Sequence, residues 1–94
     1  MMRHALRVDD AQQPIVEALR RAGIAVYIQG LPLDLLCAVK RPDGSWDTLL
    51  LEVKDDDGRI TKAQAKFLSE WPGEVHIVRS PIEALKACLG KAMD

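Results

Sequence analysis

The most constraining feature of the sequence is an apolar run, Leu49-Leu50-Leu51, that continues without Gly or Pro into Glu52-Val53-Lys54. Such a run is typical of a strand covered on both faces, and hence of a strand in the middle of a sheet. Because side chains alternate along a strand, we expect Glu52 and Lys54 on one face and Val53 on the other. A charged pair at the end of a buried strand costs desolvation energy. The pair is therefore either a candidate functional site or the point where the strand meets water.

Composition is typical of a small single domain. The 94 residues are 48% hydrophobic and 29% charged, which suits one packed core, expected over about residues 11–90 with loose termini at 1–8 and 91–94. The net charge of −1 excludes a global polycation, so nucleic-acid binding would depend on local basic patches. Cys37 and Cys88 are not spaced like metal ligands, and we expect buried, reduced thiols in a cytoplasmic protein. No membrane span or signal peptide is predicted.

Helical spacing of apolar residues predicts a first helix that begins between Ala11 and Pro14 and ends at Gly23. Its buried stripe is expected to contain Ile15, Leu19 and Ala22, with Val16 at the edge. The opposite, solvated face carries Glu17, Arg20 and Arg21. Strands are then predicted at 24–28, 33–40 and 46–54, where β-branched and apolar residues are bounded by Gly and Pro. The turn residues of 41–45 join the last two of these strands in an antiparallel hairpin.

Two capping boxes predict the later helices. Thr61 with Gln64 opens a helix that extends to Trp71, and Ser80 with Glu83 opens a last helix that should stop near Gly90. Between them, 75–78 is expected to be a short buried strand. The last helix is expected to bury Ile82, Leu85 and Leu89. The order helix, three strands, helix, strand, helix predicts an α/β (α+β) domain, with a mixed central sheet flanked by helices, because the last strand returns through a helical crossover.

Asp34, near the start of the second strand, is an acid that the hairpin can bring to Glu52 and Lys54. Pairing of residue 34 with 52 or 54 places all three side chains on one face, whereas pairing with 53 does not. A three-residue loop or a bulge gives the first register, and a plain two-residue Asp-Gly turn does not. We therefore predict an odd loop or a bulge in the hairpin.

Two carboxylates beside a lysine suit a hard divalent cation such as Mg²⁺, which prefers one or two carboxylates together with water and phosphate oxygens. The lysine would then orient or deprotonate a water, or stabilise negative charge that develops on a phosphate. The alternative is that Asp34 caps a turn and forms an ordinary ion pair with Lys54. Spacing alone leaves both interpretations open.

Four segments, spread over about residues 12–86, carry a resemblance to a known family. They are Gly30–Leu36, Leu50–Lys54, Gly58–Gln64 followed by Phe67 and Trp71, and Gly73–Ser80. With the elements between them, they resemble the PD-(D/E)XK nuclease superfamily, specifically its small Holliday-junction-resolvase-like and VRR-NUC-like members. The resemblance implies one restriction-endonuclease-like domain over residues 1–94 and a Mg²⁺- or Mn²⁺-dependent DNA endonuclease, with branched DNA or a Holliday junction among the substrates it suggests.

The resemblance also implies roles for individual residues. Asp34 and Glu52 would be metal ligands, with the backbone carbonyl of Val53 as a third, and Lys54 would be the catalytic lysine. Gln64 matches the family's glutamine that supports the site. Its other interpretation is the capping box with Thr61, and it could serve both roles.

The sequence departs from the family pattern in two places. The Glu that the family usually has early in the first helix matches Gln12 here, and a neutral amide cannot supply the same charge to a metal. Either Asp9 or Asp10 replaces it, or the site is weaker, since Glu17 lies on the wrong face of the helix. The aspartate motif is also Pro-Leu-Asp, one residue longer than Pro-Asp.

Several other residues allow a functional or a structural interpretation. Arg59, Lys62 and Lys66 could contact DNA phosphates, or could be an ordinary solvated face. The acidic run 55–57 is expected to be a solvated turn. We expect a structural role for His76 in its strand, and packing at the edge of the core for Trp46 and Trp71.

Together these features predict a Mg²⁺-dependent endonuclease whose partner is DNA, without an organic cofactor or a membrane. One small domain presents one active site, so cutting both strands would require a homodimer. The alternative is a non-catalytic nuclease-fold module that binds nucleic acid or protein. The neutral Gln12, the net charge and the acidic turn favour this alternative, whereas two unpaired acids beside Lys54 would argue against it.

Overall fold

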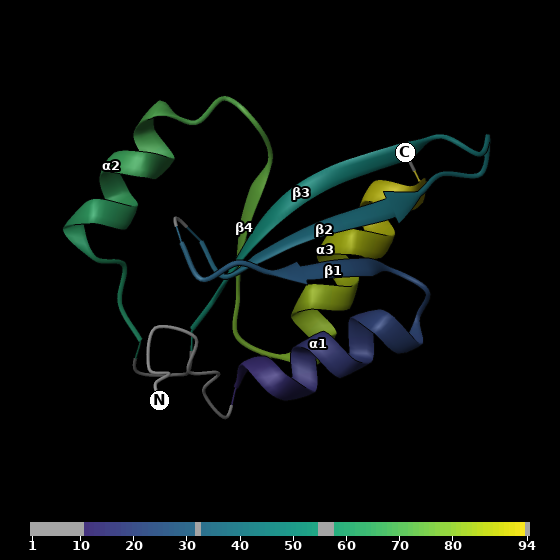
Figure 1. The fold of residues 1–94 in the computed structure, drawn as a ribbon, viewed down its shortest axis with the longest axis horizontal. Helices are drawn as coiled ribbons and strands as arrows, with labels where there is room; N and C mark the ends of the chain where they lie inside the picture. The colour runs from purple at the N-terminus through teal and green to yellow at the C-terminus, as the bar shows by residue number, and fades with distance from the viewer. Residues whose placement is uncertain (1–10, 32, 55–57, 94) are drawn as a thin grey trace.

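The computed structural model describes residues 11–31, 33–54 and 58–93, with side chains described as far as residue 90. Within these residues, three helices and four strands follow one another in the predicted order (Figure 1). They are α1 (Gln12–Arg21), β1 (Ala25–Ile28), β2 (Leu35–Lys40), β3 (Trp46–Val53), α2 (Lys62–Glu70), β4 (Val75–Val78) and α3 (Pro81–Met93). The predicted α+β class and element order are confirmed.

The strands form one mixed sheet in the order β1-β2-β3-β4. β2 pairs antiparallel with β1 and with β3, and β3 pairs parallel with β4. β3 is therefore an interior strand, and all of its residues from 49 to 53 are buried. The apolar run thus lies in the middle of the sheet, as predicted.

The turn between β2 and β3 sets the register of the hairpin. The last ladder pair is Lys40 with Trp46. Beyond it the N–H of Arg41 donates to the carbonyl of Ser45 at 2.7 Å, which leaves residues 42–44 as a three-residue loop. Gly44 closes this loop with φ +90°, a conformation that glycine adopts without strain. The predicted odd loop is confirmed.

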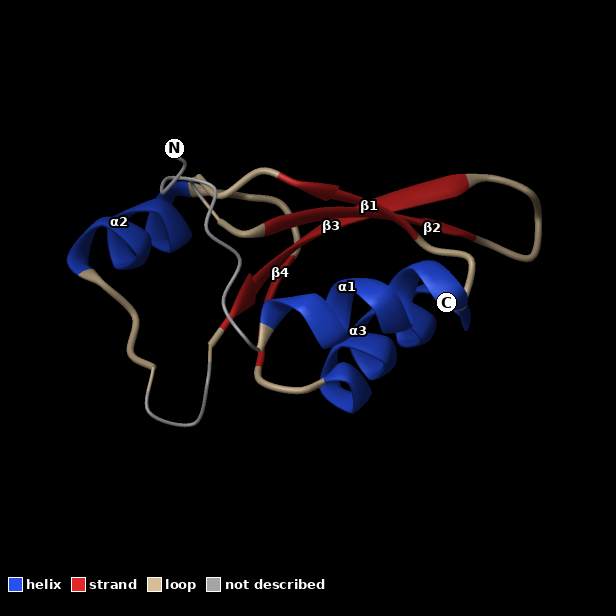
Figure 2. Cartoon of the chain, turned by 60° about the horizontal axis from the view of Figure 1, so that its bottom comes forward, coloured by secondary structure: helices blue, strands red, loops and turns tan. Residues whose placement is uncertain are grey.

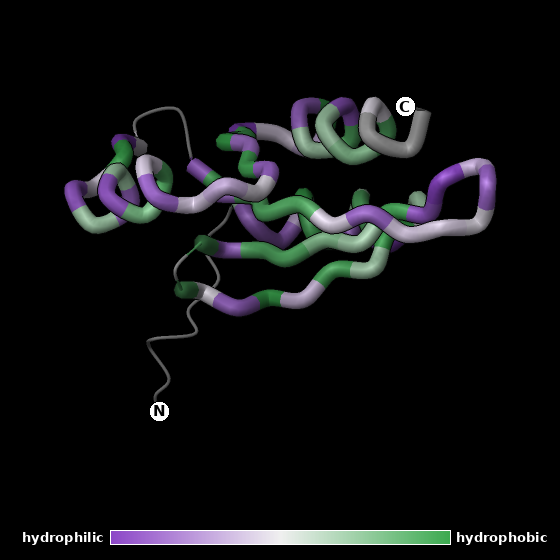
Figure 3. Tube along the Cα trace, turned by 90° about the horizontal axis from the view of Figure 1, so that it is seen from above, coloured by the Kyte–Doolittle hydropathy of each residue, from purple (hydrophilic) through white to green (hydrophobic). Residues whose placement is uncertain are grey.

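Helices α1 and α3 lie side by side against one face of the sheet (Figure 2). Alternate strand residues point into the core between these layers, because side chains alternate along each strand. The largest core side chains are Ile15, Leu19, Leu35, Leu49 and Leu51. Coloured by hydropathy, the strands are mainly hydrophobic, while the loop at the end of the hairpin is hydrophilic (Figure 3).

Helix α2 stands apart from this layer, beyond one end of the sheet, and none of its residues is buried (Figure 1). Phe67 of α2 and Trp71, which follows it, line a pocket together with Leu36 and Leu50 of the sheet. The described residues therefore cover the second face of the sheet only near this pocket, and large side chains such as Tyr27 are exposed elsewhere on it. The prediction of a sheet flanked by helices holds, but the two faces are covered unequally.

Helix α1 begins at Gln12, within the predicted interval, and its C-terminus is followed by Gly23 with φ +86°. One position of the predicted stripe is wrong: Ala22 is exposed, because it is the C-cap and lies past the last helical turn. Val16, expected at the edge, is fully buried instead. The solvated face is as predicted, with Glu17, Arg20 and Arg21 exposed.

The predicted stripe of α3 is also wrong. Ala84 and Cys88 are fully buried, whereas the larger residues are exposed or only partly buried, namely Ile82, Leu85 and Leu89. Small side chains four residues apart let α3 approach the sheet and α1 closely. The helix also continues past Gly90 to Met93, because one glycine inside a helix costs only about 1 kcal/mol. Among the helices of the described residues, none combines the length and the apolar character that crossing a bilayer requires.

Strand β4 is an edge strand, and the prediction that it is buried is wrong for all of it except Val78. His76 is half-buried there, with its Nε2 atom 2.7 Å from a carboxylate oxygen of Glu74. In the core, Cys37 and Cys88 are free, as predicted, and their side chains contact each other. The hydrogen bond with Cys88 and burial together raise the pKa of Cys37.

Candidate active site

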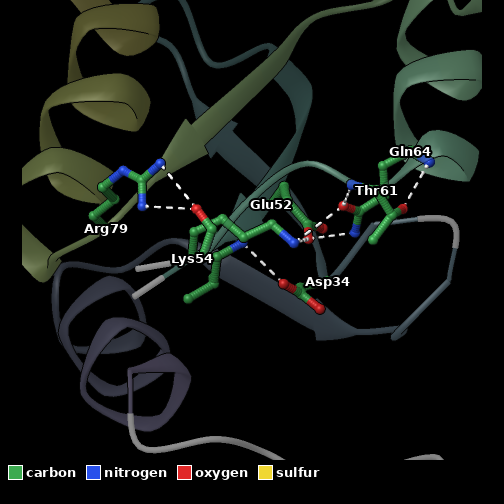
Figure 4. A network of polar contacts seen from close by, with 8 residues as sticks. Asp34, Glu52, Lys54, Thr61, Gln64 and Arg79 are labelled. Carbon is green, nitrogen blue, oxygen red and sulfur yellow. Dashed lines mark hydrogen bonds and ion pairs between the residues drawn. The ribbon is translucent and has the colours of Figure 1, made fainter. Parts of the chain in front are cut away.

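The predicted site residues meet where β2 begins and β3 ends (Figure 4). The register that pairs Leu35 with Leu51 continues by one residue to Asp34 and Glu52. Their side chains and that of Lys54 therefore share one face of the sheet, opposite to α1 and α3. The hairpin brings the three residues together as the sequence predicted.

Backbone and side-chain contacts hold Asp34 at the end of β2. The N–H of Val53 donates to Asp34 Oδ2 at 2.8 Å. The main-chain carbonyl of Asp34 accepts from the N–H groups of Gln29 at 2.9 Å and Gly30 at 3.3 Å. Gly30 has φ +81°, so this tight loop needs a residue that tolerates the left-handed region. The Asp34 carboxylate thus takes the place of a backbone acceptor beside the last residue of β3.

Glu52, Lys54 and Gln64 form a closed triangle of contacts (Figure 4). Lys54 Nζ lies 3.0 Å from Glu52 Oε2 and donates to Gln64 Oε1 at 3.0 Å. Gln64 Nε2 donates to the same Glu52 oxygen at 2.5 Å. The Glu52 side chain is 3% exposed and that of Lys54 14%, so the ion pair is poorly screened by water.

Gln64 makes the capping-box contacts and also contacts Glu52 and Lys54, so its geometry is compatible with both interpretations of the sequence. Its backbone N–H donates to Thr61 Oγ1 and its Oε1 accepts from the Thr61 N–H, both at 3.1 Å, which is the predicted capping box. The same Oε1 atom accepts from Lys54. Gln64 therefore joins α2 to the end of β3, although α2 buries no residue of its own.

Replacing Gln64 with Ala should loosen α2 selectively, because it removes the hydrogen bonds to Glu52 and Lys54 together with half of the capping box. Hydrogen bonds to charged groups contribute about 1.5–3 kcal/mol each. We expect amide exchange in α2 to accelerate by about 10-fold or more in Gln64→Ala, with no change in β3. Hydrogen–deuterium exchange measures this. The matched control is Gln13→Ala, an exposed glutamine of α1 that bonds only Glu17 among the described contacts. Equal exchange of α2 in both variants would contradict the bridging role.

The other oxygen of Glu52 fits a metal ligand. Oε1 is fully buried and has no hydrogen-bond partner among the described residues. An unsatisfied buried oxygen is costly, and a cation would be a suitable partner for a carboxylate. The carbonyl of Val53 points to the same side of β3 as its N–H, which faces Asp34. Asp34, Glu52 and the Val53 carbonyl therefore offer oxygens of the kind that Mg²⁺ or Mn²⁺ prefers.

The described residues contain no group of three or more His, Cys, Asp or Glu side chains that could hold a metal, so the fit depends on two carboxylates. Gln12, which matches the family's third acid, is 6% exposed in the first turn of α1. The N-terminal end of α1 lies at the same end of the sheet as the C-terminal end of β3 (Figures 1 and 2). Asp9 and Asp10, the proposed replacements, lie outside the described residues, as does the acidic run 55–57.

The acids beside Lys54 were expected to be unpaired, which would have favoured a catalytic site over a non-catalytic module, and this expectation is wrong. In the structure Asp34 accepts from Val53, and Glu52 accepts from Gln64 and pairs with Lys54. Both acids thus have structural partners, and the buried Oε1 of Glu52 is the group that these contacts do not explain.

The basic residues near the site differ in what they contact. Arg59, Lys62 and Lys66 are exposed, on the segment before α2 and on α2 itself. Arg79, which the sequence reasoning missed, donates from both terminal nitrogens to the carbonyl of Gly58 at 3.4 Å (Figure 4). A signal for Arg79 did exist, because it follows β4, and parallel strands end at the same edge of a sheet.

Comparisons with known proteins give no family for the chain. A scan against protein-family models finds no match, and neither the curated proteins nor the solved structures include one that matches. Support for a function therefore comes from the geometry of the site and from the sequence resemblance.

Proposed function

We propose that this chain is a Mg²⁺-dependent DNA endonuclease of the PD-(D/E)XK type. The observation that carries the proposal is the buried, unpartnered Oε1 of Glu52, at the place where Asp34 and Lys54 converge. A buried oxygen without a hydrogen-bond partner would not stabilise a purely structural ion pair. A divalent cation, Mg²⁺ or Mn²⁺, would supply its missing partner.

In this proposal the chain's own residues position and stabilise the reacting groups. Asp34, Glu52 and the carbonyl of Val53 would hold the cation, which supplies Lewis-acid polarisation of the phosphate when bound. The Lys54 ammonium, held by Glu52 and Gln64, would orient a water or stabilise charge that develops on a phosphodiester. Gln64 would keep Lys54 and Glu52 in place.

DNA would bind through backbone phosphates rather than through a global positive charge, since the chain carries a net charge of −1. Arg59, Lys62 and Lys66 are exposed beside the site and would make such contacts. One active site cuts one strand, so cleavage of both strands would take two copies with two-fold symmetry.

A cleavage assay tests the proposal. Labelled linear, flapped and four-way-junction DNA is incubated with the protein in the presence of Mg²⁺, Mn²⁺ or EDTA. We expect cutting that needs the metal and that is lost in Glu52→Gln, which keeps the size of the side chain. The matched control is Glu70→Gln, an exposed acid at the end of α2, which should cut like the wild type. Cutting in EDTA, or cutting by Glu52→Gln at the rate of the wild type, would contradict the proposal.

A second candidate is a nuclease-fold module that binds nucleic acid or protein without cleaving it. The observations in its favour are the neutral Gln12 and the hydrogen bonds that already occupy Asp34 and Glu52. DNA binding without cutting on any substrate would favour this candidate, and Gln12→Glu would then be the first variant to test for restored activity.

A further inference from the structure

A pocket of about 330 Å³, which the proposed metal site does not use, lies between the sheet and the segment of α2. Its floor is the directly paired Leu36 and Leu50, and its wall is formed by Phe67 and Trp71. The two aromatic rings are stacked, with centroids 5.5 Å apart and an angle of 20° between the planes. Pockets of this size commonly hold a small organic group.

Trp71 is held in a defined position within this wall. Gly73 lies directly against its indole, since a Cβ atom at Gly73 would come within 2.6 Å of Trp71 Nε1. Nevertheless, 45% of Trp71 remains exposed, which is high for a large apolar side chain that only fills a core. Trp71 thus packs against Phe67 and Gly73 and still leaves part of its aromatic surface accessible at the pocket that it lines.

Polar groups lie at defined points of the same pocket. Gln29, Thr48 and Glu74 line it beside the leucines and aromatic rings. An apolar site with a few polar groups recognises an aromatic ligand that also carries hydrogen-bond donors and acceptors. A nucleobase has this chemistry, because every base offers a face for stacking and an edge for hydrogen bonds.

The position of the pocket connects it with the proposed metal site. Leu36 follows Asp34 by two residues, and Leu50 precedes Glu52 by two. Because side chains alternate along a strand, the floor of the pocket and the two acids share one face of the sheet. Two residues of a strand span about 6.6 Å, a distance that one nucleotide can cover. A phosphate at Asp34 and Glu52 and the base of a neighbouring nucleotide at Trp71 could thus belong to one strand.

We propose that this pocket binds an unpaired nucleobase next to the phosphate that is cut. The inference rests on the proposed nuclease function and specifies its substrate class: DNA with unpaired nucleotides at the cleavage position, since a base within a duplex is stacked and cannot reach Trp71. Fully paired DNA would be a poor substrate for the same reason.

Fluorescence of Trp71 tests the pocket without requiring cleavage. The chain has two tryptophans, so Trp46→Phe makes Trp71 the only one. In EDTA, we expect a single-stranded oligothymidylate to quench Trp71, and a duplex or an abasic strand of equal length to leave it unchanged. Free thymidine shows whether the base alone suffices. Quenching by thymidine but not by the strand would identify a nucleoside site and overturn the DNA assignment.

Two variants test how much the stacked base contributes to binding of the single strand. Trp71→Ala should weaken binding of the single strand by about 5- to 150-fold, the usual effect of losing one stacked base. Gly73→Ala, which keeps both rings but displaces the indole, should also weaken it. Trp46→Ala is the control, because Trp46 is exposed and does not line the pocket. Unchanged affinity in Trp71→Ala would overturn the inference, as would quenching by the abasic strand.

The outcomes separate this inference from the proposed function. Metal-dependent cutting by the wild type, with unchanged strand binding in Trp71→Ala, would support the nuclease function and overturn the role of the pocket. Quenching of Trp71 by single strands without any cutting would support base binding in the pocket and overturn the nuclease function. A change in Trp71 fluorescence with protein concentration alone, accompanied by dimer formation in sedimentation, would mean that a second copy covers the pocket and would overturn the inference.

Discussion

Lys54→Met is expected to reduce metal-dependent cleavage by about 10²- to 10³-fold, the usual effect of removing one group that stabilises transition-state charge. Methionine keeps most of the length and the apolar stem of lysine but removes the ammonium that contacts Glu52 and Gln64. Single-turnover cleavage of a junction or flap substrate under saturating Mg²⁺ measures the chemical step without contributions from product release.

Lys40→Met is the matched control for this experiment, because Lys40 is exposed at the opposite end of β2 and takes part in no described ion pair. It should cut within about twofold of the wild type, as surface changes away from a site usually do. A thermal melt establishes that both variants are folded. If Lys54→Met cut as fast as Lys40→Met while both were folded, Lys54 would have no catalytic role.

Leu51→Ala should lower the free energy of unfolding by about 2–5 kcal/mol, the range for truncating a fully buried leucine. Leu51 is 0% exposed in β3, with α1 and α3 on its face of the sheet. The total stability of a domain is only about 5–15 kcal/mol, so this one change could remove a large part of it. Urea denaturation followed by circular dichroism measures the difference.

Leu31→Ala is the matched control, since it makes the same chemical change at a side chain that is 84% exposed. We expect it to change the free energy of unfolding by less than about 0.5 kcal/mol. Equal effects of the two substitutions would mean that Leu51 is not buried in the core of the folded protein.

The sheet and the meeting of the site acids could be predicted because both depend on the two-residue period of a strand. Once the hairpin loop is odd, Asp34 and Glu52 must share a face. The turn residues of 41–45 also allowed a plain Asp-Gly turn, and an odd loop was predicted because it brings Asp34 to Glu52 and Lys54. The capping box could be predicted for a similar reason, since Thr61 and Gln64 act within one helical turn.

The errors concern choices that local spacing does not determine. The buried face of α3 was assigned to its large residues, but the distance between α3 and the sheet selects Ala84 and Cys88. The position of α2 depends on long-range contacts of Gln64, which no periodicity encodes. The position of Arg79 after β4 was a usable signal, but its contact with the carbonyl of Gly58, distant in sequence, was not predictable from spacing.

The hydrogen bond from Val53 to Asp34 has a consequence for how the site can change during evolution. Because the Asp34 side chain ends the ladder between β2 and β3, its loss would leave a backbone N–H without its acceptor, whatever the protein does. A descendant that had abandoned the chemistry would still be under selection to keep Asp, or Asn, at this position. At position 52, Gln64 and Lys54 likewise contact Oε2, whereas the buried Oε1 atom has no hydrogen-bond partner among the described residues. Among relatives of this chain, an aspartate at position 34 would therefore not by itself distinguish active from inactive lineages.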